Sequence, residues 1–192
     1  MTSSSRLLIA VAAIATVAAI GACGDPTGTR GEIPVVEDTV TLYAINGSHP
    51  AAPVGFSILD GSLRPLNSAF AFDVALDLDA QGRVVVYPAR LIAGNLVPTS
   101  LAGVQKVSGT WSSVTEAPTS GYRGDSSVTL SVGEVAVIQV STEICTYAIR
   151  GVNIYGKFVV DSIKPAGREI FGRLLNNPNC GFRSLVPGVP RD

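Results

Sequence analysis

The chain has few of the side chains on which most enzymes and metal sites depend. Its 192 residues include one histidine, His49, which stands beside Pro50 in a turn-like sequence, and three cysteines far apart from one another. No cluster of histidine and cysteine has the spacing of a metal site, and no Gly-x-Ser-x-Gly nucleophile motif occurs. We therefore expect a protein that is not an enzyme and that needs no cofactor.

Charged residues are also scarce, at 15% of the chain, and the formal net charge is −1. Nothing in this balance suggests a general nucleic-acid-binding protein, which typically carries an excess of basic residues. The charges are unevenly placed, because residues 23–143 hold six Lys/Arg and twelve Asp/Glu, whereas residues 144–191 hold seven and two. We expect the two parts to pack together and neutralise each other. The alternative is a basic face for an anionic partner, such as lipid headgroups or polysaccharide.

A long apolar run occurs only at the N-terminus. Arg6 is the only charge in a short polar head, residues 7–19 form an apolar core, and small residues follow up to Cys23. This order is the layout of a secretory signal peptide. The run is about sixteen residues long, which is shorter than the roughly 20 residues that a helix needs to cross the hydrocarbon of a bilayer.

The end of this run, Ile20-Gly21-Ala22-Cys23, resembles the lipobox of bacterial lipoproteins. The resemblance implies that residues 1–22 are a signal peptide and that Cys23 is acylated, for example with palmitate. Several acyl chains on one residue hold a protein firmly on a membrane. The implied location is the bacterial cell envelope, on its periplasmic or extracellular face, with membrane lipid as a partner. The alternatives are an uncleaved anchor helix and an ordinary signal peptide cut elsewhere.

The other two cysteines, Cys145 and Cys180, become a pair once Cys23 is assigned to lipid, because an oxidising compartment favours disulfides. A bridge between them would close a loop of about 35 residues and stabilise the fold by roughly 3–4 kcal/mol. The alternative, a catalytic thiol, lacks a histidine partner.

Residues 23–35 are polar and rich in glycine and proline, and we expect a flexible tether there. The remainder, residues 36–192, is rich in Val and Thr segments separated by turn residues. This pattern predicts a single all-β domain, an antiparallel sandwich or flattened barrel of about nine or ten strands. The expected segments include strands over residues 90–96 and 143–150, a hairpin over residues 127–141, and a bulge at Gly156 in a strand over residues 153–163.

The clearest alternation lies in residues 70–79, where apolar residues face one side while Asp73, Asp77 and Asp79 face the other. It predicts a strand with an acidic outer face, paired in a hairpin with residues 83–87. Asp77, Asp79 and Gln81 also resemble the opening of a calcium loop, although Pro88 stands where the closing acid would be. Asp73 and Asp77 could serve as the paired carboxylates of a glycan hydrolase.

The longest polar stretch, residues 108–127, carries Trp111, the only tryptophan, and Tyr122. Aromatic rings on such a loop are candidate ligand-binding residues, because flat rings stack on sugar faces. The alternative is that Trp111 folds back over the core. Taken together, the sequence favours a membrane-anchored envelope lipoprotein whose β domain binds or scaffolds an envelope protein or glycan. The alternatives are a hydrolase that acts on glycans and a structural envelope subunit.

Overall fold

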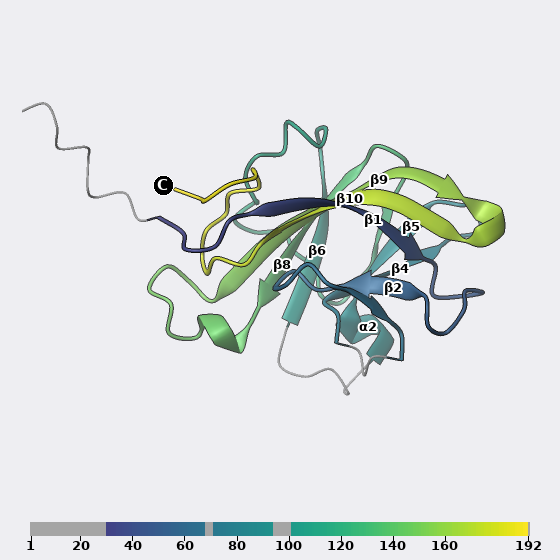
Figure 1. Ribbon diagram of the computed structural model, residues 1–192, viewed down its shortest axis with the longest axis horizontal. Coiled ribbons are helices and arrows are strands. Elements are labelled where there is room, and N and C mark those ends of the chain that lie inside the picture. Colours follow the sequence, from purple (N-terminus) through teal and green to yellow (C-terminus); the bar gives the residue numbers. More distant parts are fainter. Residues whose placement is uncertain (1–29, 68–70, 94–100, 192) are drawn as a thin grey trace, which may run out of the picture. The chain divides into compact units, whose positions relative to one another are not determined.

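Figure 1 shows the fold in a computed structural model, which describes residues 30–67, 71–93 and 101–191. One compact unit covers Arg30–Arg191. It contains two five-stranded sheets in which all the strand pairs are antiparallel. The first sheet has the order β1 (Val36–Tyr43), β10 (Glu169–Asn177), β9 (Asn153–Lys164), β8 (Val135–Ser141) and β6 (Leu101–Val107). The second has the order β3 (Leu63–Pro65), β2 (Pro53–Phe56), β4 (Val74–Leu78), β5 (Val84–Pro88) and β7 (Val128–Leu130).

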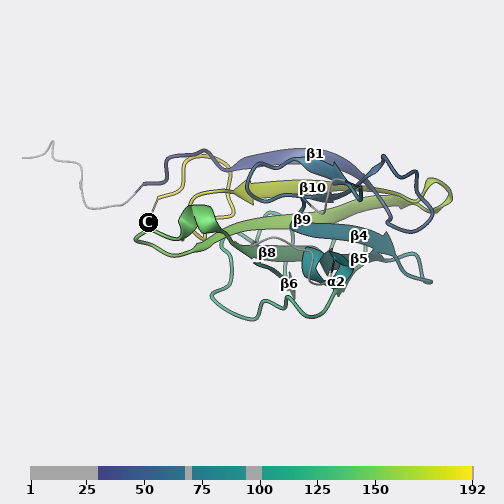
Figure 2. The same ribbon diagram turned by 90° about the horizontal axis from the view of Figure 1, so that it is seen from below.

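The two sheets lie one over the other as a sandwich (Figure 2), as the sequence predicts. Their facing sides bury one large apolar cluster to which both sheets contribute. Phe56 of β2 and Phe158 of β9 meet at its centre, with their ring centroids 5.6 Å apart. Alternating Val, Ile and Leu side chains supply most of the rest, since residues two apart on a strand face the same side.

The predicted hairpin between β4 and β5 is present, with Asp77 opposite Val85 and Leu78 opposite Val84. Its acidic outer face is not exposed, and this part of the prediction is wrong. Asp73 and Asp77 are both buried. A second apolar cluster, formed by Val54, Phe72, Ala75 and Ala89, covers this side of the sheet.

Two segments depart from the expected strands. Residues 89–93 form the short helix α2 (Ala89–Ala93) instead of a strand, since Ala, Arg and Leu favour helix; residues 94–96 lie outside the described residues. The segment around Cys145 begins with a 3₁₀ turn, η2 (Glu143–Cys145), closed by local backbone hydrogen bonds. A third short helix, η3 (Pro165–Gly167), joins β9 to β10.

The predicted hairpin over residues 127–141 does not form, because β7 pairs with β5 whereas β8 pairs with β6 and β9. The turn between β7 and β8, which contains Gly133 at φ 85°, therefore takes the chain from one sheet to the other. Local alternation predicts each strand but carries no information about which partner the strand will find.

The bulge expected at Gly156 lies elsewhere, because the register between β9 and β10 shifts where Phe171 and Gly172 face Ser162 and Val160. Gly156 has a different role. A β-carbon there would stand 2.5 Å from Ile58 Cδ1 and 2.7 Å from the Leu175 carbonyl oxygen, so the glycine lets Ile58, which follows β2, pack closely against β9.

The described N-terminal residues are attached to the C-terminal segment. Gly31 donates its N–H to the Pro190 carbonyl at 2.8 Å, and Val35 pairs with Gly188. Residues 1–29, which include Cys23 and most of the expected tether, lie outside the described residues. Within the described part of the chain, no helix has the length and apolar character needed to cross a membrane.

Candidate functional site

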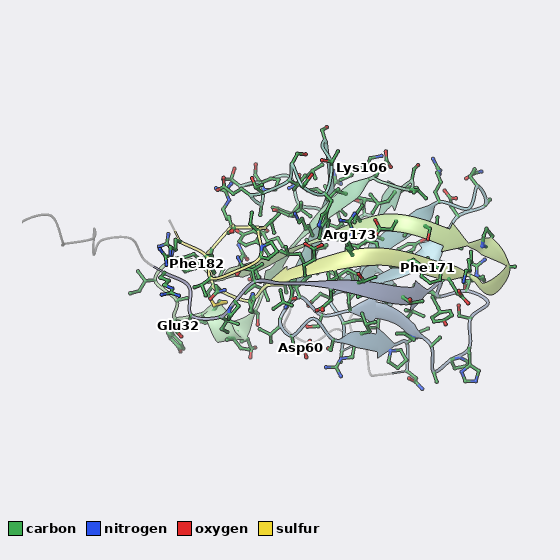
Figure 3. The ribbon with its side chains drawn as sticks, turned by 45° about the horizontal axis from the view of Figure 1, so that its top comes forward. Glu32, Asp60, Lys106, Phe171, Arg173 and Phe182 are labelled. Carbon is green, nitrogen blue, oxygen red and sulfur yellow. A yellow bond between two sulfur atoms is a disulfide. The ribbon has the colours of Figure 1, made fainter. Side chains whose placement is uncertain are left out.

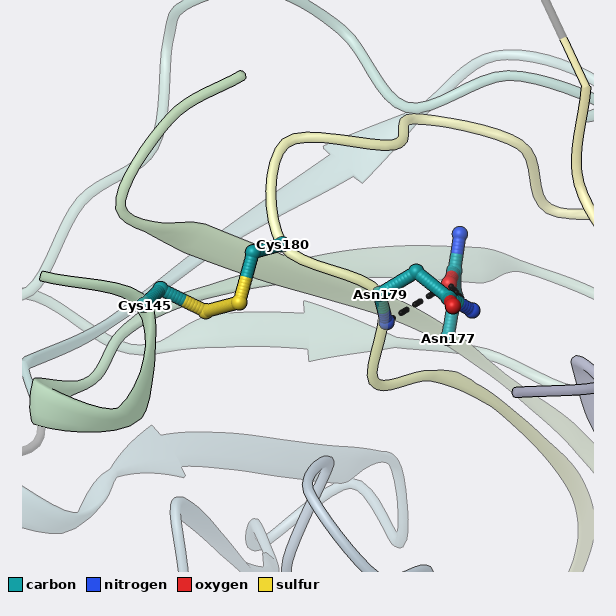
Figure 4. Close-up of a disulfide and its surroundings, with 4 residues drawn as sticks. All are labelled: Cys145, Asn177, Asn179 and Cys180. Carbon is teal, nitrogen blue, oxygen red and sulfur yellow. Dashed lines mark hydrogen bonds between the residues drawn. A yellow bond between two sulfur atoms is a disulfide. The ribbon is translucent and has the colours of Figure 1, made fainter. Parts of the chain in front are cut away.

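The disulfide joins Cys145 to Cys180, with an S–S distance of 1.98 Å and a Cα–Cα distance of 5.5 Å (Figure 4). The predicted pairing is therefore confirmed. Cys145 is fully buried and belongs to the main apolar cluster. The bridge fastens the segment after β10 to the η2 turn, rather than to a strand as the sequence suggests. We call this region, comprising residues 30–33, 142–152 and 178–182, the disulfide end.

Two asparagines next to the bridge hold the first described residues in place. Asn179 Oδ1 accepts the backbone N–H groups of Glu32 and Ile33, both at 2.9 Å, and its Nδ2 donates to the Ile33 carbonyl at 2.7 Å. Asn177 Oδ1 accepts hydrogen bonds from the backbone N–H of Asn179 at 3.0 Å and from its Nδ2 at 2.9 Å (Figure 4). The first described residues are thus fixed against the segment that follows β10.

A hollow of about 360 Å³ opens at the disulfide end. Figure 3 shows Glu32 and Phe182 at this end of the domain and Phe171 at the other. The guanidinium of Arg150 lies 4.4 Å from the centroid of the Phe182 ring. The hollow is lined by residues from the three chain segments of this end, among them Arg30, Ile33, Ile144, Ile149, Arg150 and Phe182.

Trp111 is buried against a third apolar cluster on the outer side of the first sheet, so it covers the core rather than forming an exposed lip. Its indole Nε1–H donates to Glu37 Oε1 at 3.1 Å. Tyr122, the other candidate, is half-buried in the same cluster and donates its hydroxyl to the Pro118 carbonyl at 3.0 Å. Burial raises the pKa of Tyr122. Both rings are therefore engaged by the protein itself.

Lys157 lies beneath Trp111 and was not predicted as a buried residue. Its Nζ donates to the carbonyls of Trp111 and Val114, both at 2.8 Å, and lies 4.3 Å from the Trp111 ring centroid. Burial lowers the pKa of this ammonium group, while the nearby Glu37 acts to raise it. The lysine fastens residues 108–127 to β9. In the alternation of β9, Lys157 lies on the same side as Tyr155 and Val159, and these two neighbours were the only sign in the sequence that this side is apolar.

The acidic candidates also have protein partners. Asp73 Oδ2 accepts the Ile58 N–H at 2.7 Å. Asp77 forms an ion pair with Arg168 at 2.8 Å and accepts a hydrogen bond from the Asn46 side chain. The structure therefore does not bring Asp73 and Asp77 together in an open groove.

The residues of the calcium hypothesis are engaged in the same way. Asp79 forms an ion pair with Arg83 at 2.7 Å and accepts the Gln81 N–H at 2.9 Å, while Asp77 is held by Arg168. Among the residues that the structure describes, no group of three or more His, Cys, Asp and Glu is placed to hold a metal ion.

His49 lines a second hollow of about 360 Å³, which is mainly apolar. Its Nδ1 accepts the Ala51 N–H at 3.2 Å. The hydroxyl of Ser48, the adjacent hollow-lining residue, donates to the Ala44 carbonyl at 2.5 Å rather than to the imidazole. Ser48 and His49 therefore do not form a nucleophile and base pair in this arrangement.

The chain was compared with protein-family models, with curated proteins and with solved structures, and none of the three comparisons found a match.

Proposed function

We propose that this protein is a lipid-anchored protein of the bacterial cell envelope, whose β-sandwich binds or scaffolds an envelope protein or glycan without catalysing a reaction. The observation that carries the proposal is the lipobox-type sequence Ile20-Gly21-Ala22-Cys23, which stands seven residues before Arg30, the first residue of the folded unit.

The buried disulfide supports the proposed compartment. Disulfides persist in oxidising environments such as the bacterial periplasm and the cell surface, and are rare in the cytosol. Cys145 and Cys180 are bonded, and Cys23 is the only other cysteine in the sequence. The cysteine usage is thus consistent with one lipidated residue and one structural bridge.

The arrangement of the candidate residues favours binding or scaffolding over glycan hydrolysis. A retaining or inverting hydrolase needs two carboxyl groups that flank a substrate groove. Asp77 is instead paired with Arg168, and Asp73 accepts a backbone N–H. A subunit that joins partners by edge strands is also less favoured, because the edge strand β1 carries Glu37 and Asp38, and charged residues discourage edge pairing.

Metabolic labelling with radioactive palmitate tests the anchor. We expect the wild-type protein to incorporate label and to sediment with membranes, and the Cys23→Ala variant to do neither. The matched control is Cys180→Ala, which removes a different cysteine and should keep the label. Equal labelling of wild type and Cys23→Ala would contradict the proposal.

A pull-down from envelope extracts, with the lipidated full chain as bait, tests the binding role. We expect repeated recovery of the same envelope protein or glycan. Release of sugar fragments from cell-wall glycan by the purified protein would instead favour the hydrolase.

A further inference from the structure

The loop at the disulfide end, residues 142–152, exposes large apolar side chains. Ile144 is 67% exposed, Tyr147 94% and Ile149 fully exposed, while Val152 adds a fourth apolar residue that is partly accessible. Single exposed apolar residues are common on protein surfaces, but several on one short segment mark an interaction site. We call this segment the apolar loop.

The apolar loop is held in a defined conformation. Cys145 anchors it to the core through the disulfide, and Cys145, Thr146 and Ala148 each donate a backbone hydrogen bond within the loop. Gly181 packs against the backbone of Arg150, where a β-carbon would stand 2.6 Å from the carbonyl carbon. The exposed side chains therefore project from a fixed base.

The apolar loop lies beside the point at which the chain enters the domain. Arg30 and Ile33 line the same hollow as Ile144 and Ile149. Six residues lie between Cys23 and Arg30, so a fully extended chain spans at most about 25 Å over the seven residue steps that join them. An acyl anchor on Cys23 would therefore keep the disulfide end within that distance of the bilayer.

The charged residues around the apolar loop suit a phospholipid surface. At this end Arg30 and Arg150 are exposed, and so is Arg191, which pairs with Arg30, against two exposed acids, Glu32 and Glu143. Apolar side chains bordered by arginine match the boundary between acyl chains and headgroups, where tyrosine is also favoured. A second copy of the chain fits less well. The three most exposed side chains, one tyrosine and two isoleucines, offer roughly 300–500 Å² in all, whereas a stable dimer buries roughly 800 Å² on each partner.

We propose that the apolar loop inserts Ile144, Tyr147 and Ile149 into the bilayer to which Cys23 is anchored, and so fixes the orientation of the sandwich on the membrane. This inference rests on the proposed lipid anchor. It adds a second, non-covalent contact to the membrane and assigns the disulfide end as the face turned toward lipid.

Tryptophan fluorescence can test the insertion. The full lipidated chain is reconstituted into vesicles of phosphatidylethanolamine and phosphatidylglycerol, with or without bromine atoms on the acyl chains, which quench nearby tryptophan. The test variant is Tyr147→Trp and the matched control is Val132→Trp, which is 57% exposed in the turn between β7 and β8. The wild type supplies the signal of the buried Trp111. We expect the added tryptophan of Tyr147→Trp to lose at least half of its emission in brominated vesicles, and that of Val132→Trp to keep it.

Palmitate labelling of the same samples separates the two proposals. A labelled protein in which both added tryptophans keep their emission overturns the insertion and leaves the anchor standing. An unlabelled wild type overturns the anchor and the insertion with it. Emission from Tyr147→Trp that shifts with protein concentration, and not with brominated lipid, would show that a second copy covers the apolar loop, and also overturns the insertion.

Discussion

Removal of the Cys145–Cys180 bridge should lower the free energy of unfolding by about 4 kcal/mol, as estimated from the length of the loop that it closes. The two cysteines are 35 residues apart, and the chain-entropy relation gives about 4 kcal/mol for a loop of this length at 25 °C. Folded domains are stable by only roughly 5–15 kcal/mol. The bridge should therefore supply a large share of the stability of the sandwich.

The measurement is urea unfolding followed by the fluorescence of Trp111. The protein is produced from residue 24 onward, so that only the two bridging cysteines remain. Two perturbations are compared: reduction of the wild-type bridge, which keeps both sulfur atoms, and the double variant Cys145→Ala/Cys180→Ala, which removes them.

Reduction alone should cost about 4 kcal/mol by the loop-closure argument. The double variant should cost on the order of 1 kcal/mol more, because Cys145 is fully buried in the main apolar cluster. If reduction leaves the free energy of unfolding unchanged while the double variant loses stability, then packing and not the cross-link stabilises this end, and the reasoning is refuted.

Two further substitutions test contacts inside the domain. Lys157→Met should lower the free energy of unfolding by about 2–4 kcal/mol, because it leaves the buried carbonyls of Trp111 and Val114 without a donor. The control is Lys106→Met, which removes an exposed ion pair and should lower the free energy of unfolding by less than about 1 kcal/mol. Since the pKa of Lys157 is lowered by folding, wild-type stability should gain a contribution as pH rises toward 10.5, and Lys157→Met should lack it. Gly172→Ala should cost about 1–3 kcal/mol, because its β-carbon would stand 2.3 Å from the Val159 carbonyl oxygen. A value for either substitution within error of the wild type, by urea unfolding, would contradict the assigned contact.

The strands that could be predicted from the sequence are those whose alternation matches a single buried face. In β4, Val74 and Leu76 lie in the main cluster, and the hairpin to β5 follows from the turn at Gly82. The two-residue alternation of apolar side chains depends only on the local sequence, so it identifies a strand whichever segment that strand packs against. The all-β class could be predicted for the same reason.

The burial and the partners of the polar side chains could not be predicted, because the residues around them come from distant parts of the chain. Asp77 looks like a solvent-facing acid in its own segment, yet Arg168, 91 residues away, pairs with it. Lys157 is covered by residues 108–127, which read as a polar loop. Alternation identifies two sides of a strand, but it cannot tell which of them a later segment will cover.

The apolar loop shows why the strand predicted over residues 143–150 was wrong, and what its residues indicate instead. Ile144, Tyr147 and Ile149 have the composition of a strand, but they face outward while Cys145 alone is fully buried beneath them. Burial in the core would have stabilised each of these side chains by about 1.5–3 kcal/mol. The fold forgoes this gain and still holds the loop with a disulfide and with backbone hydrogen bonds inside the loop. A fixed loop with its apolar side chains outward is what insertion into a second apolar phase requires, and the acyl anchor proposed at Cys23 would place such a phase within reach.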